Sequence, residues 1–474
     1  MFALATAGSA MDMSASFKAY DVRGIVGESI TAESCEAVGA AFVDVLGLRG
    51  QSIFCGGDMR PSSPAFTAAF AAGATKRGAD VRDVGLISTD ELYYACGAFD
   101  AAGAIFTASH NPAEYNGIKM AQAGAVPVSS ETGLNEIRDL AQQYLTEGIP
   151  GDVSPGSIVA FDILNGYAEK LRSLVDLGSI RPLKVVVDAA NGMAGLTVPA
   201  VLGDQILPAL PLTVVPLYFE LDGTFPNHPA NPLDPDNLRD LQAAVVEHGA
   251  DLGLAFDGDA DRCFVVDEKG QPLTPSAITS LIAVREIARA RTAGAAEPAV
   301  IHNLITSKAV PEFITAAGGR PVRTRVGHSF IKARMAAEGA VFGGEHSAHY
   351  YFRDFYNADT GMLAAMHVLA ALGEQPVPLS ELGREFEPYT ASGEINSSVE
   401  GVASTVARVH ASFESLGGVV VDQLDGLSIS SETGDWWFNV RASNTEALLR
   451  LNVEGKDAAT MQRVRDSVLE LIRR

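Results

Sequence analysis

The sequence lacks two features that are typical of membrane and nucleic-acid-binding proteins. No apolar run reaches the roughly 18 residues that a membrane-spanning helix needs. Basic residues are few, with 35 Lys and Arg against 58 Asp and Glu, and the net charge of -23 repels nucleic acids and anionic membranes at long range. We therefore expect no membrane and no nucleic acid as partner, and an anionic ligand requires locally placed Arg or Lys.

Cysteine is also scarce, and its spacing offers no Cys-x-x-Cys pair for a zinc or redox site. The chain has four cysteines, all far apart: Cys35, Cys55, Cys96 and Cys263. This usage predicts reduced thiols in a cytoplasmic protein. The N-terminal residues are small and apolar, and no Lys or Arg precedes Lys18, so the charged region of a secretory signal is missing. We predict a disordered extension over residues 1–14.

A chain of 474 residues is too long for one hydrophobic core, which predicts three or four domains. Over residues 31–360, short apolar strands alternate with amphipathic helical segments, the pattern of an α/β protein. Three strands lead into a polar residue at similar intervals, as expected for a repeated α/β unit: 52–55 with Asp58, 184–189 with Asp188 and 299–305 with Asn303.

After a break at 373–378, strand-like runs are followed by a helical segment at 456–474, which indicates a smaller α+β domain. The predicted fold is therefore three similar mixed-sheet α/β domains plus a C-terminal α+β domain around a central cleft. The predicted boundaries are 15–152, 157–264, 265–376 and 380–474.

The strongest local signal is DGDADR at 257–262, between two apolar strands. Asp257, Asp259 and Asp261 alternate in a tight loop, so the three carboxylates can converge on one hard divalent cation. Mg²⁺ suits such a site because it prefers carboxylate oxygens and keeps positions open for water or phosphate. The loop therefore predicts a Mg²⁺ site.

Three alternatives to this site stay open at the sequence level. An EF-hand would use Glu268 as its last ligand, but Arg262 replaces the glycine that the loop requires and the flanks read as strands. An Asp-x-Asp-x-Thr phosphotransferase would use Asp257 as nucleophile, but Asp261 stands where the hydroxyl belongs. A solvated acidic turn would leave three crowded carboxylates repelling one another.

A second signal is TASHNP at 107–112, directly after the apolar strand GAIF. A serine at the carboxyl end of a strand lies where α/β sheets bind ligands, and its hydroxyl can carry a phosphoryl group. Ser109 is therefore a candidate nucleophile. The alternatives are a polar turn and a serine hydrolase using His110, and the second is disfavoured because the Gly-x-Ser-x-Gly elbow is absent.

Together these segments resemble the α-D-phosphohexomutase superfamily, the phosphomannomutase and phosphoglucomutase enzymes, from about Ser16 to the C-terminus. Four motifs occur in the family's order: TASHNP at 107–112, DGDADR at 257–262, GEHSAH at 344–349 and RASNTEALLR at 441–450. Shorter matches support them: YDVRG at 20–24, GDMRPSS at 57–63, NGIK at 116–119, FPNHPANP at 225–232 and VGHS at 326–329. The resemblance implies an isomerase that moves a phosphoryl group between O1 and O6 of a hexose phosphate.

The resemblance also implies roles for single residues. Ser109 is expected to be a phosphoserine that completes the Mg²⁺ site of Asp257, Asp259 and Asp261, with a hexose 1,6-bisphosphate as intermediate and activator. Family positions near the reacting hydroxyl are matched by Arg23, Lys119, His328 and His349. The sugar and its phosphate are expected to contact Arg262, Glu345 and Ser347, together with the phosphate loop residues Arg441, Ser443, Asn444, Thr445 and Arg450.

The phosphate loop also has a physical reading of its own. A guanidinium such as that of Arg441 can grip phosphate as a fork, and hydroxyl, amide and backbone donors can complete an anion cradle. A polar hairpin between strands is the alternative reading.

The sequence leaves the preferred sugar and the assembly open. The Asn-Thr-Glu segment at 444–446 resembles mannose and glucose enzymes more than phosphoglucosamine mutases, which stay the alternative within the family. Two readings outside it are an Asp257-dependent phosphatase and a non-catalytic sugar-phosphate binding protein. We expect hexose phosphates as ligands of a monomer or homodimer.

Overall fold

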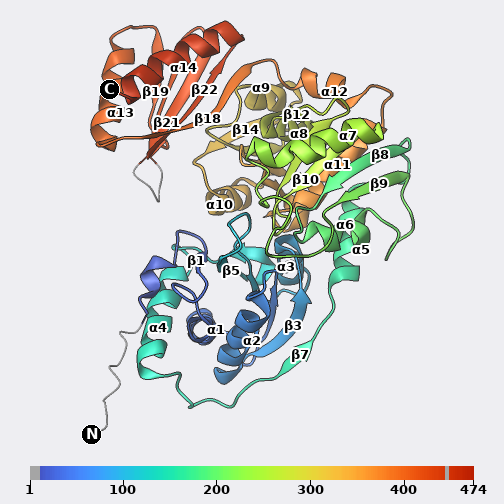
Figure 1. Cartoon of the computed structure of the whole chain (residues 1–474), viewed down its shortest axis with the longest axis vertical. Coiled ribbons are helices and arrows are strands. Elements are labelled where there is room, and N and C mark those ends of the chain that lie inside the picture. The colour runs from blue at the N-terminus through green and yellow to red at the C-terminus, as the bar shows by residue number, and fades with distance from the viewer. Residues whose placement is uncertain (1–10, 443–447) are drawn as a thin grey trace. The chain divides into compact units, whose positions relative to one another are not determined.

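The computed structural model describes residues 11–442 and 448–474, without the side chains of 328 and 329 (Figure 1). The chain forms two compact units, one made of residues up to 272 together with 349–378, the other of residues 273–348 and 379–474. Within the described ranges, no helix is both long and apolar enough to cross a bilayer. All four cysteines are buried free thiols, as predicted.

The first unit begins with a seven-stranded mixed sheet in the order β1-β5-β4-β2-β3-β7, with β6 paired to β5. Its strands are β1 (Val22–Ile25), β2 (Ser52–Gly57), β3 (Asp80–Leu86), β4 (Gly103–Phe106), β5 (Tyr115–Gln122), β6 (Val126–Pro127) and β7 (Ile158–Ala160). The helices are η1 (Met13–Ala15), α1 (Ala32–Leu46), α2 (Ser63–Lys76), α3 (Thr89–Ala98), η2 (Ala123–Ala125) and α4 (Leu134–Glu147).

Both faces of this sheet are covered. Successive side chains of a strand point to opposite faces, and in β2 Ile53 and Cys55 join a core that includes residues of α1, α2 and α4. Phe54, which lies between them, instead contacts Phe99 after α3 and Phe161, with ring centroids 5.3 and 5.7 Å away. The parallel strands β2 and β4 are thus buried on both sides, which explains their continuous apolar runs.

The first unit continues with a second sheet, in which the strands run β11-β10-β8-β9. Its elements are α5 (Leu164–Leu174), β8 (Leu183–Asp188), α6 (Ala194–Val201), β9 (Leu212–Leu217), η3 (Pro235–Leu238), α7 (Arg239–His248), β10 (Leu252–Phe256) and β11 (Cys263–Asp267). The later segment 349–378 is not part of this sheet. It contains β16 (Tyr350–Phe352), η4 (Arg353–Phe355) and β17 (Ala358–Asp359), with β16 and β17 paired antiparallel, followed by the fully buried α11 (Gly361–Gly373).

The second unit contains the parallel strand order β14-β13-β15. Its elements are α8 (Pro275–Thr292), β13 (Ala299–Asn303), α9 (Ala309–Ala316), β14 (Arg320–Thr324), α10 (His328–Glu338), β15 (Phe342–Gly344) and α12 (Leu379–Glu385). The short β12 (Pro272–Leu273) lies at the boundary between the units.

The C-terminal part of the second unit is a five-stranded antiparallel sheet in the order β18-β22-β21-β20-β19. It comprises β18 (Thr390–Ser398), α13 (Val402–Glu414), β19 (Val419–Asp422), β20 (Leu427–Ser431), β21 (Trp436–Ala442), β22 (Leu448–Gly455) and α14 (Ala458–Ile472). Helices α13 and α14 share one core with the sheet (Figure 1), in which Trp436 stacks on Phe438 at 6.1 Å. The predicted fold class, three α/β domains followed by an α+β domain, is confirmed.

Three predicted boundaries differ from the structure. Met13 lies in η1 and is buried, so chain predicted to be disordered already packs on the first domain; residues 1–10 lie outside the described ranges. Strand β7 pairs with β3 in the first sheet, although the boundary at 157 places it in the second domain. Strand β11 forms a hairpin with β10, so the boundary at 264/265 cuts through a strand.

Candidate active site

The acidic loop at 257–262 is the turn of the β10–β11 hairpin, in which Phe256 pairs with Cys263. Asp257, Asp259 and Asp261 are each at most 1% exposed, and one oxygen of each lies within 4.8 Å of the others. Burial and the two neighbouring carboxylates raise the pKa of Asp257 to about 7. Although burial opposes ionisation of Asp261, Lys119 and His349 hold the pKa of that carboxyl at about 2.

This donor set fits a hard divalent cation. All three side chains offer carboxylate oxygens, the ligands that Mg²⁺ prefers. The Oδ1 atoms of Asp259 and Asp261 are buried and have no hydrogen-bond partner within the described parts of the chain. Such atoms are costly unless a ligand satisfies them, so the loop could hold a metal ion.

Ser109 lies in the loop that follows β4 and touches the acidic loop directly. Its Oγ donates a hydrogen bond of 2.7 Å to Asp257 Oδ2, and its side chain is 1% exposed. The backbone at Ser109 is left-handed, with φ 51°, and its N–H donates to Thr107 Oγ1 at 2.9 Å. A non-glycine residue in this conformation is strained, which is common at functional sites.

Arg60 is the residue that fixes this loop, and the sequence analysis gave it no role. Its buried guanidinium donates to four backbone carbonyls of the serine loop, at 2.7–2.9 Å: those of Ser109, Asn111, Pro112 and Tyr115. Asp58 pairs with Arg60 at 3.2 Å, and the ring of Phe225 lies 5.2 Å from the guanidinium carbon. Two signals in the sequence could have found it: a charged Asp-x-Arg directly after a buried strand, and its place in the family match GDMRPSS at 57–63.

Two predicted cationic residues, Lys119 and Arg23, lie at the same site. Lys119 Nζ bonds to Asp259 Oδ2 at 2.7 Å and to Asp261 Oδ2 at 2.6 Å. Arg23 binds Asp21 at 2.8 Å through Nε and donates to Asn111 Oδ1 at 2.6 Å through Nη1. Both therefore add positive charge beside Ser109 and the acidic loop.

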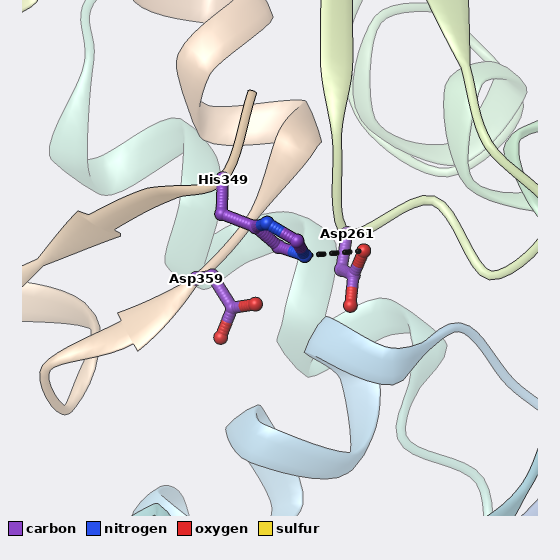
Figure 2. Close-up of side chains that lie close together, drawn as sticks. All are labelled: Asp261, His349 and Asp359. Atoms are coloured by element: carbon purple, nitrogen blue, oxygen red, sulfur yellow. Dashed lines mark ion pairs between the residues drawn. The ribbon is translucent and has the colours of Figure 1, made fainter. Parts of the chain in front are cut away.

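His349 and Arg262 form the other edge of the site. Arg262 Nε donates to His349 Nε2 at 3.2 Å, and Arg262 Nη2 lies 3.0 Å from His110 Nδ1. Figure 2 shows the His349 ring between Asp261 and Asp359, with Nε2 3.6 Å from Asp261 Oδ1. Asp359 comes from β17 and is buried, and sequence reasoning missed it because no motif covers it.

Two further buried carboxylates, Asp90 and Glu91, lie in the first turn of α3, which contacts the acidic loop. The hydroxyl of Thr89 donates to Asp259 Oδ2 at 2.6 Å, which ties this helix to the loop. The next residue, Asp90, accepts from Tyr167 at 2.7 Å and from Thr360 at 2.6 Å. Asp90 thus joins three segments of the first unit, far apart in the sequence.

The remaining predicted residues belong to the second unit. Ser347 Oγ donates to Glu345 Oε2 at 2.7 Å, and Glu345 is buried. Arg441 and Arg450 both bind Glu394, at 3.0 and 3.3 Å. Ser443, Asn444 and Thr445, and the side chain of His328, lie outside the described parts of the structure.

Comparison with known proteins covers nearly the whole chain. Four family models match in order: "Phosphoglucomutase/phosphomannomutase, alpha/beta/alpha domain I" at 14–147, domain II at 165–270, domain III at 275–389 and the C-terminal domain at 394–471. A phosphomannomutase of Salmonella montevideo is 40% identical, over 96% of this chain and 98% of that protein. Phosphohexose mutases of Xanthomonas campestris pv. campestris (strain ATCC 33913) are 39% identical, over 96% and 99%.

Solved structures give the same result. A phosphoglucomutase/phosphomannomutase family protein from Burkholderia thailandensis matches with a TM-score of 0.84 and 28% identity, over 98% of each chain. A putative phosphomannomutase from Thermus thermophilus matches with a TM-score of 0.76, and at 22% identity it supports the fold alone.

Proposed function

The chain belongs to the phosphoglucomutase/phosphomannomutase family and is a hexose phosphate mutase, and we propose that it works through a phosphoryl group carried on Ser109. The observation that carries this proposal is the 2.7 Å contact between Ser109 Oγ and Asp257, which are 148 residues apart. It joins a buried hydroxyl to a loop of three carboxylates, and such a loop suits phosphoryl transfer when a cation offsets its charge.

The proposed cycle balances without net consumption of phosphate. A sugar hydroxyl oxygen attacks the phosphorus of phosphoserine, the bond from phosphorus to Ser109 Oγ breaks, and the hydroxyl proton leaves to a nearby base. The hexose 1,6-bisphosphate turns over in the site. Ser109 Oγ then attacks the other phosphate, and the released sugar oxygen takes up a proton.

Asp257, Asp259, Asp261 and the phosphorylated Ser109 are the residues that would hold Mg²⁺. When bound, this ion offsets the negative charge of the phosphoryl group in transit. Arg23, Lys119 and His328 are assigned to the reacting hydroxyl, where positive charge and proton exchange are needed. Arg60 holds the backbone of the serine loop in place.

The second unit supplies the remaining substrate contacts in this proposal. Glu345 and Ser347 are assigned to the sugar hydroxyls, and the phosphate loop is assigned to the distal phosphate through Arg441, Ser443, Asn444, Thr445 and Arg450. In the first unit, Arg262 and His349 are assigned to substrate binding. Mannose and glucose phosphates are the proposed substrates, and similarity to phosphomannomutases supports mannose. Turnover of glucosamine 1-phosphate above that of mannose 1-phosphate would reassign the enzyme. The four free, buried thiols support a cytoplasmic location, with a monomer or homodimer as the proposed assembly.

The first prediction is that Ser109→Ala lowers kcat by roughly a thousand-fold or more, because the variant cannot carry the phosphoryl group. The matched control is Ser179→Ala, an exposed serine, which we expect to keep wild-type activity. Steady-state assays with mannose 1-phosphate and glucose 1,6-bisphosphate provide the measurement. Near wild-type turnover in the Ser109 variant sinks the proposal.

Phosphosite mapping after brief incubation with glucose 1,6-bisphosphate separates the mutase cycle from its rivals. Hydroxylamine-stable phosphate on Ser109 supports the cycle. Labile acyl phosphate on Asp257 indicates an aspartyl phosphotransferase instead. Absence of any label is the result expected of a protein that only binds sugar phosphates.

A further inference from the structure

In the carboxylates of Asp259 and Asp261, the protein supplies hydrogen bonds to one oxygen only, which is Oδ2 in both. Asp259 Oδ2 accepts from Lys119 Nζ at 2.7 Å and from Thr89 Oγ1 at 2.6 Å. Asp261 Oδ2 accepts from the same ammonium at 2.6 Å. The Oδ1 atoms of both side chains are buried and lack a hydrogen-bond partner among the residues that the structure describes. Asp261 Oδ1 lies 3.6 Å from His349 Nε2 and 3.9 Å from Arg262 Nε, both beyond hydrogen-bond range.

Lys119 is held where it bridges these two residues. It comes from β5, where it pairs with Ile105 of β4, and its side chain is only 11% exposed. The Asp259 backbone is fixed as well, since its carbonyl accepts from the Thr89 N–H at 3.1 Å. Rotation of the Asp259 carboxylate would therefore break two short hydrogen bonds. One oxygen of each carboxylate is committed to the protein and the other is left for a ligand.

The geometry points to Lys119 as a built-in counter-ion of the metal loop. It presents one oxygen of Asp259 and one of Asp261 to the divalent cation, and its own charge opposes that cation. The inference rests on the proposed function, because it assumes that the loop binds a metal ion.

The positive charge of Lys119 is expected to lower the affinity of the acidic loop for a divalent cation. Without Lys119, three buried carboxylates would attract a divalent cation strongly even when Ser109 carries no phosphate. With the ammonium in place, its positive charge offsets part of the negative charge of the carboxylates and weakens their attraction for the cation. A phosphoryl group on Ser109 adds about -1.5 to -2 charges at neutral pH, so it restores the attraction. Cation binding is therefore expected to be tighter in the phosphorylated enzyme, and by linkage the cation favours the phosphorylated form.

The test is calorimetric titration of MnCl₂ into the full-length, dephosphorylated protein. Manganese suits the site because it shares the oxygen preference of magnesium. Lys119→Met is expected to bind Mn²⁺ at least about ten-fold more tightly than wild type, since one unit charge close to a divalent ion is removed from a low-dielectric site. Lys119→Gln, which keeps a donor but no charge, is expected to behave in the same way.

Lys76→Met is the matched control, because Lys76 pairs with Glu36 on the surface of the same unit. This variant should bind Mn²⁺ like wild type. Melting curves with and without MnCl₂ test the fold: Lys119→Met should melt below wild type without metal and gain more than wild type from its addition, because Mn²⁺ takes over the lost counter-charge.

The outcomes separate this inference from the function on which it rests. If neither wild type nor the variants bind Mn²⁺, the proposed metal site fails. If wild type binds and folded Lys119→Met or Lys119→Gln binds equally or more weakly, the counter-ion role alone is overturned. Equal affinity of the phosphorylated and dephosphorylated wild type would instead contradict the proposed contact between the phosphoserine and the cation.

Discussion

Glu91 and Asp90 show that single residues behind the site titrate outside their ordinary range. Burial and the charge of Asp90 raise the pKa of Glu91 to about 8, and burial raises the pKa of Asp90 to about 6. The folded protein therefore keeps protons that the unfolded chain releases above about pH 4.5. Stability must fall as the pH rises from that value towards 8, because the folded state binds more protons over this window.

We predict that Glu91→Gln is more stable than wild type at pH 8 by about 1–3 kcal/mol and equally stable near pH 4. The amide oxygen can still accept from the Ser88 N–H, which Glu91 binds at 2.7 Å. Chemical denaturation at a series of pH values measures the difference. Parallel stability curves for the two proteins would show that Glu91 is ionised at pH 8. Asp90 and Asp257, whose pKa values are also raised, contribute to the slope that remains in the variant.

At the residue scale, local sequence patterns indicated the side chains whose neighbours are local, whereas Lys119, whose partners are distant, was reached only through the family resemblance. The three aspartates lie in one hairpin turn, and Ser109 follows an apolar strand, so their positions could be predicted. Arg60 acts on the loop of Ser109, a residue 49 positions later in the chain. Nothing in a polar turn indicates such a partner.

At the scale of elements, the serine loop and the acidic loop meet through a glycine. A Cβ at Gly258 would lie 2.4 Å from the Ser109 carbonyl oxygen, a backbone atom that cannot move aside. The same carbonyl is held by Arg60 at 2.9 Å. The two loops can approach each other this closely only because residue 258 has no side chain.

Gly258→Ala is therefore expected to separate the two loops and to lower kcat/KM by about 100-fold, since small displacements of reacting groups cost rate. Gly151→Ala is the control, because an added Cβ there meets no atom within 4 Å and its φ is not positive. Circular dichroism checks that both variants fold. Retained activity in Gly258→Ala would mean that the loops need not touch during turnover.

Sequence patterns predicted elements with an apolar face and missed those without one. Strands β2, β8 and β13 were predicted because their runs are buried. Strand β18 was not predicted because most of its residues are exposed or half-buried. Strand β7 was not predicted because all three of its residues are exposed. Both lie at sheet edges, where backbone pairing defines a strand that the side chains do not mark.

At the scale of the whole molecule, the residues proposed to bind the cation and those proposed to bind the distal phosphate lie in different compact units. The acidic loop and Ser109 belong to the first unit, whereas Arg441 and Arg450 belong to the second unit. We predict two thermal transitions in scanning calorimetry. MnCl₂ should stabilise only the first unit, adding about 2.7 kcal/mol to its free energy of unfolding at a concentration of one hundred times Kd. Inorganic phosphate should raise only the transition temperature of the second unit.

Tryptophan fluorescence assigns these transitions, because the chain has two tryptophans and both lie in β21 of the second unit. Asp259→Asn is the control and should lose the response to Mn²⁺. A fluorescence-detected transition that moves with Mn²⁺ would contradict this division.

The composition of the first unit has a consequence for synthesis on the ribosome. Residues 273–348 interrupt this unit, so the acidic loop emerges long before His349, Asp359 and Thr360. The hydrogen bond from Thr360 to the buried Asp90 spans 270 positions of the chain. At about 5–20 residues per second, the nascent first unit must wait roughly 4–18 s after residue 272 until Thr360 is translated. During that interval the carboxylates behind the active site are translated but not yet enclosed.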